Sequence, residues 1–143
     1  MSNEVFVSYS AEETHQIGAS LGLQLPLGCV VTFSGDLGSG KTTLIRGLIE
    51  SATNTSAREI CSPTFTYLNI YTGDKTIYHF DLYRLKREND FLNAGFADFL
   101  GGTGICCIEW PEIINGLLPQ ARIHVTLSYC DEGARKIEIV RYE

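Results

Sequence analysis

The chain has 143 residues, of which 44% are hydrophobic and 20% charged, and this balance is typical of one globular domain with a substantial core. Its net charge of −6 and its pI near 5.0 argue against broad direct binding of nucleic acid, which depends on Lys and Arg neutralising phosphates. Action on RNA would then require a partner that holds the RNA. We predict a single domain over residues 1–143.

Cysteine use and hydropathy indicate a cytoplasmic protein. The cysteines are odd in number and include no C-x-x-C pair, which argues against a disulfide framework or a zinc site; they are Cys29, Cys61, Cys106, Cys107 and Cys130. We expect reduced, mostly buried thiols. No basic segment followed by an apolar stretch opens the sequence, and no apolar run approaches the roughly 18 residues of a membrane span. We therefore expect neither a secretory signal nor contact with a membrane.

The N-terminal segment predicts a strand followed by a helix. Residues 4–9 alternate between apolar and polar side chains, as a strand does. Ser10 and Glu13 then have the spacing of a capping box, in which the serine caps the helix and the glutamate reaches back. The helix that they open should end before Pro26.

The segment 29–52 carries the strongest functional signal. Residues 35–42 match the phosphate-binding P-loop pattern G-x-x-x-x-G-K-[ST] at every fixed position, between an apolar run at 29–33 and apolar side chains at helical spacing. In that arrangement, backbone N–H groups and the helix N-terminus bind phosphates. Lys41 would contact the β- and γ-phosphates, and the Thr42 hydroxyl would bind Mg²⁺. An ordinary glycine-rich turn is the alternative that these flanks disfavour.

The remainder of the chain predicts two hairpins, short helices and one central strand. Because hairpins are antiparallel and the strands around a P-loop are parallel, we predict an α/β P-loop NTPase fold. Its mixed sheet would have a parallel core, antiparallel edge strands and helices on both faces. The segments are a hairpin at 67–71 and 76–80, short helices within 88–100 that break at glycines, a strand at 104–108, and a hairpin at 122–129 and 136–141.

Hydrolysis also needs a carboxylate for the metal, and two predicted strands end in one. Glu109 follows the apolar run 105–108, as a Walker-B carboxylate does, and Asp81 follows the run 76–80. Either has a structural alternative, because Glu109 could cap the turn at Pro111 and Asp81 could pair with Arg84. The sequence leaves open which of the two carboxylates holds the metal.

Five other residues have weaker signals or none. Thr64 lies in a loop after Ser-Pro, where nucleotide switches place a threonine that senses the γ-phosphate, although a plain turn has the same sequence. The single tryptophan, Trp110, is interpreted as a core residue. His79 is interpreted as a packed or hydrogen-bonded histidine, and neither His15 nor His124 has a recognisable partner spacing.

Together these motifs resemble the TsaE family, formerly YjeE, the small ATPases of bacterial tRNA threonylcarbamoyladenosine synthesis. The resemblance spans nearly the whole chain and rests on segments of the sequence in a fixed order: SAEET at 10–14, GDLGSGKTT at 35–43, SPTFT at 62–66, YHFDLYR at 78–84 and IEWP at 108–111. The chain departs from the family pattern at 89–95, where the family has a more acidic helix. The resemblance therefore does not define the surface that faces a partner.

The resemblance implies a weak intrinsic ATPase that requires ATP and Mg²⁺ and acts with the proteins TsaB and TsaD, so that tRNA is reached only indirectly. It implies that Thr42 and Glu109 bind the metal and that Thr64 lies on a switch-like loop. Asp81 would be an acidic catalytic or metal-shell residue. The residues that would contact the nucleotide are Thr14, Asp36, Leu37, Gly38, Ser39, Gly40, Lys41, Thr42, Thr43 and Arg135.

Two other classes of function remain open from the residues alone. A small-molecule P-loop kinase would need an arginine-bearing lid and an acceptor pocket, for which 143 residues leave little room. A nucleotide switch without turnover is the other alternative. The sequence has no N/T-K-x-D motif for guanine, so we expect adenine rather than guanine. No residue stands out as a strong general base, which predicts slow turnover in the absence of partners.

Overall fold

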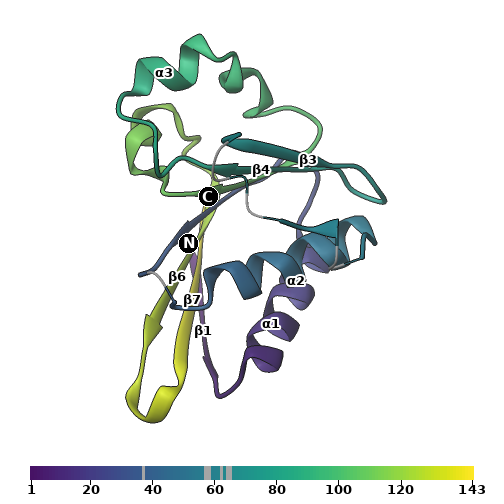
Figure 1. Ribbon diagram of the computed structural model, residues 1–143, viewed down its shortest axis with the longest axis vertical. Helices are drawn as coiled ribbons and strands as arrows, with labels where there is room; N and C mark the ends of the chain where they lie inside the picture. Colours follow the sequence, from purple (N-terminus) through teal and green to yellow (C-terminus); the bar gives the residue numbers. More distant parts are fainter. Residues whose placement is uncertain (37, 57–58, 62, 64–65) are drawn as a thin grey trace.

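The computed structural model describes residues 1–36, 38–56, 59–61, 63 and 66–143. Leu37 and Thr64, for which the sequence predicts roles, lie outside these described residues. The described strands form one seven-stranded sheet in the order β1-β7-β6-β2-β5-β4-β3 (Figure 1). Their bounds are β1 Ser2–Ser8, β2 Val30–Ser34, β3 Leu68–Tyr71, β4 Ile77–Asp81, β5 Ile105–Glu109, β6 Arg122–Tyr129 and β7 Arg135–Tyr142.

The centre of the sheet is parallel and its edges are antiparallel. β2 lies between β5 and β6 and pairs in parallel with both, and β4 pairs in parallel with β5. β3 runs antiparallel to β4 at one edge, and β7 runs antiparallel to β6 and β1 at the other. Both hairpins form where the sequence predicts them. The mixed sheet with a parallel core is thus confirmed.

Helices cover both faces of the sheet, as predicted. α1 (Ala11–Gln24) and α2 (Lys41–Thr53) pack together on one face. The other face carries α3 (Glu88–Asn93) and the 3₁₀ helices η2 (Phe96–Phe99) and η3 (Pro111–Leu117) (Figure 1). The short 3₁₀ turn η4 (Asp131–Gly133) forms the tip of the β6–β7 hairpin. The sequence did not predict the 3₁₀ helix η3.

Glycines allow α1 and α2 to approach each other very closely. A Cβ atom at Gly18 would collide with the carbonyl oxygen of Leu44, and one at Gly47 would collide with that of His15. At the start of α1, the Ser10 hydroxyl accepts the backbone N–H of Glu13 at 3.0 Å, which confirms the predicted N-cap. The helix pair is therefore held by direct backbone contact and cannot easily rotate.

The turn of the β3–β4 hairpin fixes the far ends of both helices. Lys75 donates from Nζ to the carbonyl oxygens of Gly22, Leu23 and Leu25 at 3.3, 3.2 and 2.7 Å, and so satisfies the C-terminal carbonyls of α1. Its own backbone N–H bonds to the carbonyl of Ala52 near the end of α2. The carboxyl ends of β2, β4 and β5 and the start of α2 lie at the other end of the helices, away from Lys75.

All five cysteines are free thiols, in agreement with the prediction. Cys106 and Cys107 are buried, but Cys61 is exposed, so the expected burial is only partly met. Burial raises the pKa of Cys29 to about 11 and that of Cys106 to about 12. Among the described residues, no helix has the length and hydropathy needed to span a membrane.

Candidate functional site

A cleft of about 560 Å³ lies where the carboxyl ends of β2, β4 and β5 meet the start of α2. This is the edge at which open α/β sheets bind ligands. The cleft gathers most of the residues that the sequence predicts for the site: Thr14, Asp36, Gly38, Gly40, Lys41, Thr42, Thr43, Asp81, Glu109 and Arg135. Ser39 is buried beneath the loop.

The loop between β2 and α2 requires glycine at several positions. Gly38 has a φ of 80° and Gly40 a φ of 101°, in the left-handed region that disfavours other residues. A Cβ atom at Gly35 would lie 2.7 Å from Ser39 Oγ and 2.8 Å from the carbonyl oxygen of Leu127. The backbone of the loop therefore turns in a way that side chains would prevent.

The start of α2 is open to an anion. Gly40 occupies the N-cap position and provides no side-chain cap, while its carbonyl accepts the N–H of Leu44 at 2.9 Å. The N–H groups of the first helical turn need partners from outside the helix. Ser39 Oγ is also buried and has no hydrogen-bond partner among the described residues. Unpaired amides, an orphan hydroxyl and the helix dipole fit a phosphate group.

Lys41 begins α2 and is only 6% exposed. None of the ion pairs found among the described residues involves it, and its Nζ lies 4.1 Å from the centre of the Trp110 ring. A desolvated ammonium over an indole ring is stabilised by a cation–π interaction. The amine is thus held inside the cleft, close enough to Asp81 to lower the pKa of that carboxyl but without an ion pair among the described residues, and it can contact a bound phosphate there.

Trp110 has a role that the sequence did not indicate. Its ring packs partly on the apolar cluster around Phe80, as the core interpretation expects, but it also lines the cleft beneath Lys41 and lies 5.0 Å from the ring of Tyr83. Its φ of 55° is unusual for a bulky residue. The only sequence signal is Pro111, which disfavours a right-handed helical conformation at the preceding residue.

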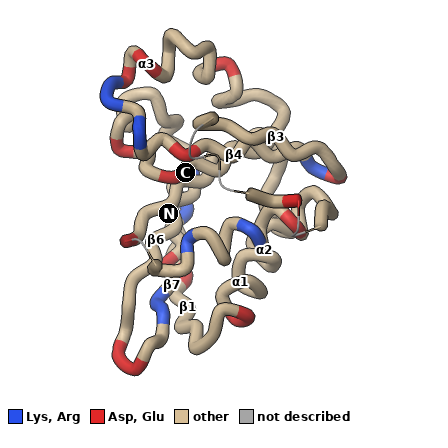
Figure 2. The backbone as a smooth tube through the Cα atoms, viewed as in Figure 1, with Lys and Arg blue, Asp and Glu red and all other residues tan. Residues whose placement is uncertain are grey.

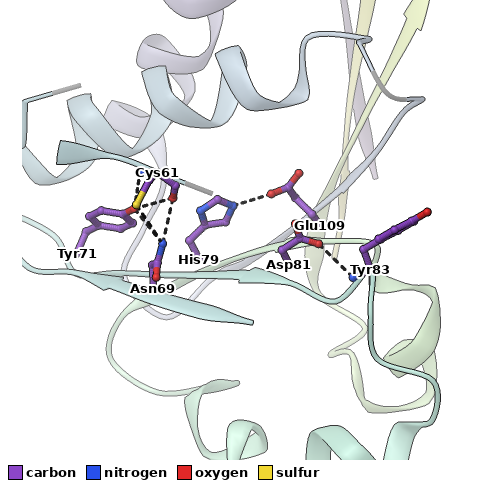
Figure 3. Close-up of polar contacts among 7 residues, drawn as sticks. All are labelled: Cys61, Asn69, Tyr71, His79, Asp81, Tyr83 and Glu109. Carbon is purple, nitrogen blue, oxygen red and sulfur yellow. Dashed lines mark hydrogen bonds and ion pairs between the residues drawn. The ribbon is translucent and has the colours of Figure 1, made fainter. Parts of the chain in front are cut away.

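Asp81 and Glu109 are the last residues of β4 and β5 and lie directly opposite each other in the parallel pair. Both are buried, and both line the cleft. Asp81 Oδ1 accepts the backbone N–H of Tyr83 at 3.1 Å (Figure 3). Burial is the main cause that raises the pKa of Asp81, and the nearby Glu109 raises it further. The hydrogen bond from the backbone N–H of Tyr83 and the side chains of His79 and Lys41 lower this pKa, but by less.

The side chain of Glu109 bonds to a histidine and does not cap the following turn. Its Oε2 lies 2.8 Å from His79 Nε2, with side-chain exposures of 8% and 4% (Figure 3). The interpretation of His79 as a hydrogen-bonded histidine is confirmed. The sequence did not indicate its partner, because the contact depends on β4 lying beside β5. The other two histidines also have partners, His15 with Glu50 and His124 with Thr32.

Thr14 and Arg135 border the loop from two other elements. Thr14 lies in the first turn of α1, and its Oγ1 is 2.7 Å from Oγ of Ser8 at the end of β1. Arg135 Nη2 donates to the carbonyl oxygen of Gly38 at 3.4 Å, and its guanidinium lies 4.2 Å from the ring of Tyr129. The β6–β7 hairpin therefore contacts the glycine loop directly.

The donors in the cleft fit a magnesium ion better than a transition metal. The part of the chain that the structure describes contains no cluster of three or more His, Cys, Asp or Glu side chains able to hold a metal. Thr42 and Glu109 line the cleft and also a small cavity next to it, bordered by α2, β4, β5 and residues 60–61. Mg²⁺ is commonly held by one or two protein oxygens together with substrate phosphates, which is the set that this cleft offers.

The sequence of this chain is similar to those of known proteins over most of its length. The sequence model of the family described as "Threonylcarbamoyl adenosine biosynthesis protein TsaE" matches residues 8–137. A protein of Treponema pallidum named tRNA threonylcarbamoyladenosine biosynthesis protein TsaE is 39% identical, over 93% of this chain and 97% of its own length. A Haemophilus influenzae protein of the same name is 42% identical over 78% of this chain and 69% of its length.

The fold is similar to that of a solved structure. A crystal structure of Bacillus subtilis YdiB superposes with a TM-score of 0.80 and 28% identity, over 99% of this chain and 87% of the other. A Bacillus subtilis protein named TsaE is 36% identical over 92% of this chain and 84% of its own length. The family model covers most of the chain, and several relatives exceed 30% identity over most of it. The chain belongs to the TsaE family.

Proposed function

We propose that this chain is a magnesium-dependent ATPase that serves the biosynthesis of threonylcarbamoyladenosine in tRNA, in the cytoplasm and together with TsaB and TsaD. Membership of the TsaE family supports the pathway. One observation carries the chemistry: the uncapped start of α2 and its glycine loop face two buried carboxylates across a single cleft. That arrangement provides both a phosphate cradle and oxygen ligands for a cation.

Each part of the cleft has a separate task in this proposal. The amides of the loop and the start of α2 would hold the phosphates, and Lys41 would move from Trp110 to the β- and γ-phosphates. Thr42 and Glu109 would bind Mg²⁺, which when bound neutralises charge that develops on the transferred phosphoryl group. Asp81 would act beside them as an acidic catalytic or metal-shell residue. Thr64, outside the described residues, stays a predicted switch residue.

The tRNA would be reached through partner proteins. The chain carries 17 acidic and 11 basic residues, and Figure 2 shows Lys and Arg dispersed among acidic residues. Along the described residues, Figure 2 reveals no continuous basic stripe. Affinity for nucleic acid depends mainly on clustered Lys and Arg, so this distribution supports indirect action. With no strong general base in the cleft, slow turnover that rises when TsaB and TsaD are added is the expected behaviour.

ATP hydrolysis by the purified chain, with and without TsaB and TsaD, tests the proposal. We expect slow Mg²⁺-dependent release of phosphate that the partners accelerate, and a loss of roughly 100-fold or more in Lys41→Ala, since removal of one preorganised charge costs about this much. Lys86→Ala, which removes an exposed lysine outside the cleft, is the matched control. Unchanged hydrolysis in Lys41→Ala would remove the P-loop from the reaction. ADP release stimulated by metabolites and not by TsaB and TsaD would indicate a kinase.

A further inference from the structure

His79 is a buried histidine to which the phosphate chemistry assigns no task. It lies on β4, two residues before Asp81, and therefore on the same face of the sheet. Its direct neighbour on β5 is Cys107, whereas Glu109 is the direct neighbour of Asp81. Glu109 nevertheless reaches diagonally along the sheet to His79, as Figure 3 shows. The hydrogen bond thus selects one orientation of the carboxylate.

We propose that His79 is the positioning residue for the metal-binding carboxylate. Nε2–H of His79 donates to Oε2 of Glu109, because a carboxylate can only accept. Oε1 of Glu109 has no hydrogen-bond partner among the described residues. It is also absent from the buried atoms that lack a partner, so Oε1 is accessible from the cleft. The histidine therefore ties down one oxygen and leaves the other for a cation next to Thr42. This inference rests on the proposed function, since it takes Glu109 as a metal ligand.

The second ring nitrogen of His79 is not used by Glu109. His79 Nδ1 is buried and has no hydrogen-bond partner within the described part of the chain. The ring borders a cavity of about 10 Å³ between α2 and the segment before β3, whose lining includes Thr42, Arg46 and Cys61. A cavity of this size holds at most about one water molecule. With Nε2–H bound to Glu109, Nδ1 presents a lone pair to that cavity, where a donor can complete the network.

The segment over His79 is fixed by side chains of β3. Tyr71 Oη accepts the backbone N–H of Cys61 at 3.1 Å and donates to its carbonyl oxygen at 3.0 Å, and Asn69 Nδ2 donates to the same carbonyl at 3.0 Å (Figure 3). Asn69 is also the direct cross-strand neighbour of His79. These bonds fix the position of Cys61, which lines the small cavity beside His79.

Residues that orient a metal ligand through a hydrogen bond change metal affinity by roughly 10- to 100-fold when they are removed. The test titrates Mn²⁺, as a spectroscopic substitute for Mg²⁺, into the intact chain saturated with ADP and follows free Mn²⁺ by electron paramagnetic resonance. We expect His79→Ala to bind Mn²⁺ roughly 10- to 100-fold more weakly. His79→Gln, whose amide provides an N–H near the position of Nε2, should recover most of the affinity. ADP binding without metal should be the same in all three proteins.

Further variants separate positioning from general damage. His79→Leu fills the volume of the ring without a donor and should repeat the loss, so the test does not depend on the folding of His79→Ala. His124→Gln changes a partly buried, hydrogen-bonded histidine outside the cleft and should leave Mn²⁺ affinity unchanged. In a Glu109→Gln background, His79→Ala should have no further effect on Mn²⁺ affinity.

Two outcomes contradict the inference in different ways. Equal Mn²⁺ affinity in the wild-type chain, His79→Ala and His79→Leu would overturn the role of His79 alone. A wild-type chain that binds neither ADP nor Mn²⁺ would overturn the proposed function and this inference together.

Discussion

The two sides of the cleft are built in different ways. The proposed phosphate side is one contiguous stretch, residues 35–43, whose proposed binding groups are backbone amides and a single ammonium. The proposed metal side is assembled from side chains at the ends of β4 and β5, which come together only because these strands are neighbours in the sheet. Backbone amides do not titrate, whereas burial raises the pKa of the Asp81 carboxyl at the end of β4.

This difference means that the two sides can be disrupted separately. A change on the phosphate side should reduce nucleotide binding whether or not metal is present. A change on the metal side should affect only the contribution of the metal, because the amides and Lys41 remain in place. The following predictions test that separation, from the largest expected effect to the smallest.

Glu109→Gln should cause the largest loss. The amide has the shape of the carboxylate but lacks its charge, so Mg²⁺ should bind roughly 100-fold more weakly and turnover should fall by at least the same factor. Calorimetry with ADP in the presence and absence of Mg²⁺ measures the two contributions. Metal-free ADP affinity should stay at the wild-type value; a large decrease there would show that the two sides are not independent.

Gly40→Ala should weaken nucleotide binding about tenfold with and without Mg²⁺. The φ of 101° at Gly40 disfavours any side chain by roughly 1 to 2 kcal/mol, and relaxation of the backbone would turn the helix amides away from the phosphate. Gly95→Ala, at a left-handed glycine outside the cleft with open space around its Cβ position, is the matched control for strain alone. If Gly40→Ala lowered only metal-dependent affinity, the backbone account of the phosphate side would be wrong.

Asp81→Asn should stabilise the nucleotide-free protein near neutral pH while lowering turnover. The pKa of Asp81 is raised in the folded state, so the folded protein binds more protons than the unfolded chain between the ordinary carboxylate value and the raised one. The contribution of Asp81 to the free energy of unfolding is therefore most favourable below about pH 4, and it is lost as the pH rises through the pKa that Asp81 has in the folded protein. The advantage of the variant should therefore shrink on acidification.

Urea unfolding at several pH values measures this effect. Asp98→Asn, which neutralises an exposed carboxylate on η2, should leave the pH dependence of unfolding unchanged. An Asp81→Asn protein that is less stable than wild type at neutral pH would contradict the assigned cost of burial.

The fluorescence of Trp110 should report the movement of the Lys41 ammonium from the indole ring to the bound phosphates. It is the only tryptophan, so any change in indole emission comes from this site. Binding of an ATP analogue should move the ammonium away from the ring and change the emission, a contact worth about 0.5 to 2 kcal/mol. The change should be absent in Lys41→Ala. Identical emission with and without bound analogue would mean that Lys41 stays on Trp110.

The phosphate side could be predicted from the sequence because its geometry is local. Glycines at fixed spacing, an apolar strand before them and a helix after them define the loop without reference to the rest of the chain. The sequence also identified Asp81 and Glu109, since each ends an apolar strand. Both residues do end their strands, as the last residues of β4 and β5.

Contacts between distant segments could not be predicted in the same way. The bond from His79 to Glu109 requires the strand order, which no single segment encodes. The position of Trp110 beneath Lys41 depends on an unusual backbone conformation, and an isolated aromatic residue is more often part of a core. Likewise, helix propensity alone makes Gly18 and Gly47 unfavourable in a helix. Only the packing of α1 against α2 shows that a side chain at either position would collide with the other helix.

The direct backbone contact between α1 and α2 has a consequence for the whole domain. Thr14 on α1 and Lys41 on α2 both border the cleft, and no side chain lies between the helices at Gly18 to absorb a displacement. A molecule held by both helix starts would restrain the pair as one rigid block. Amide hydrogen exchange should then slow along both helices in step, far beyond the residues that the ligand touches.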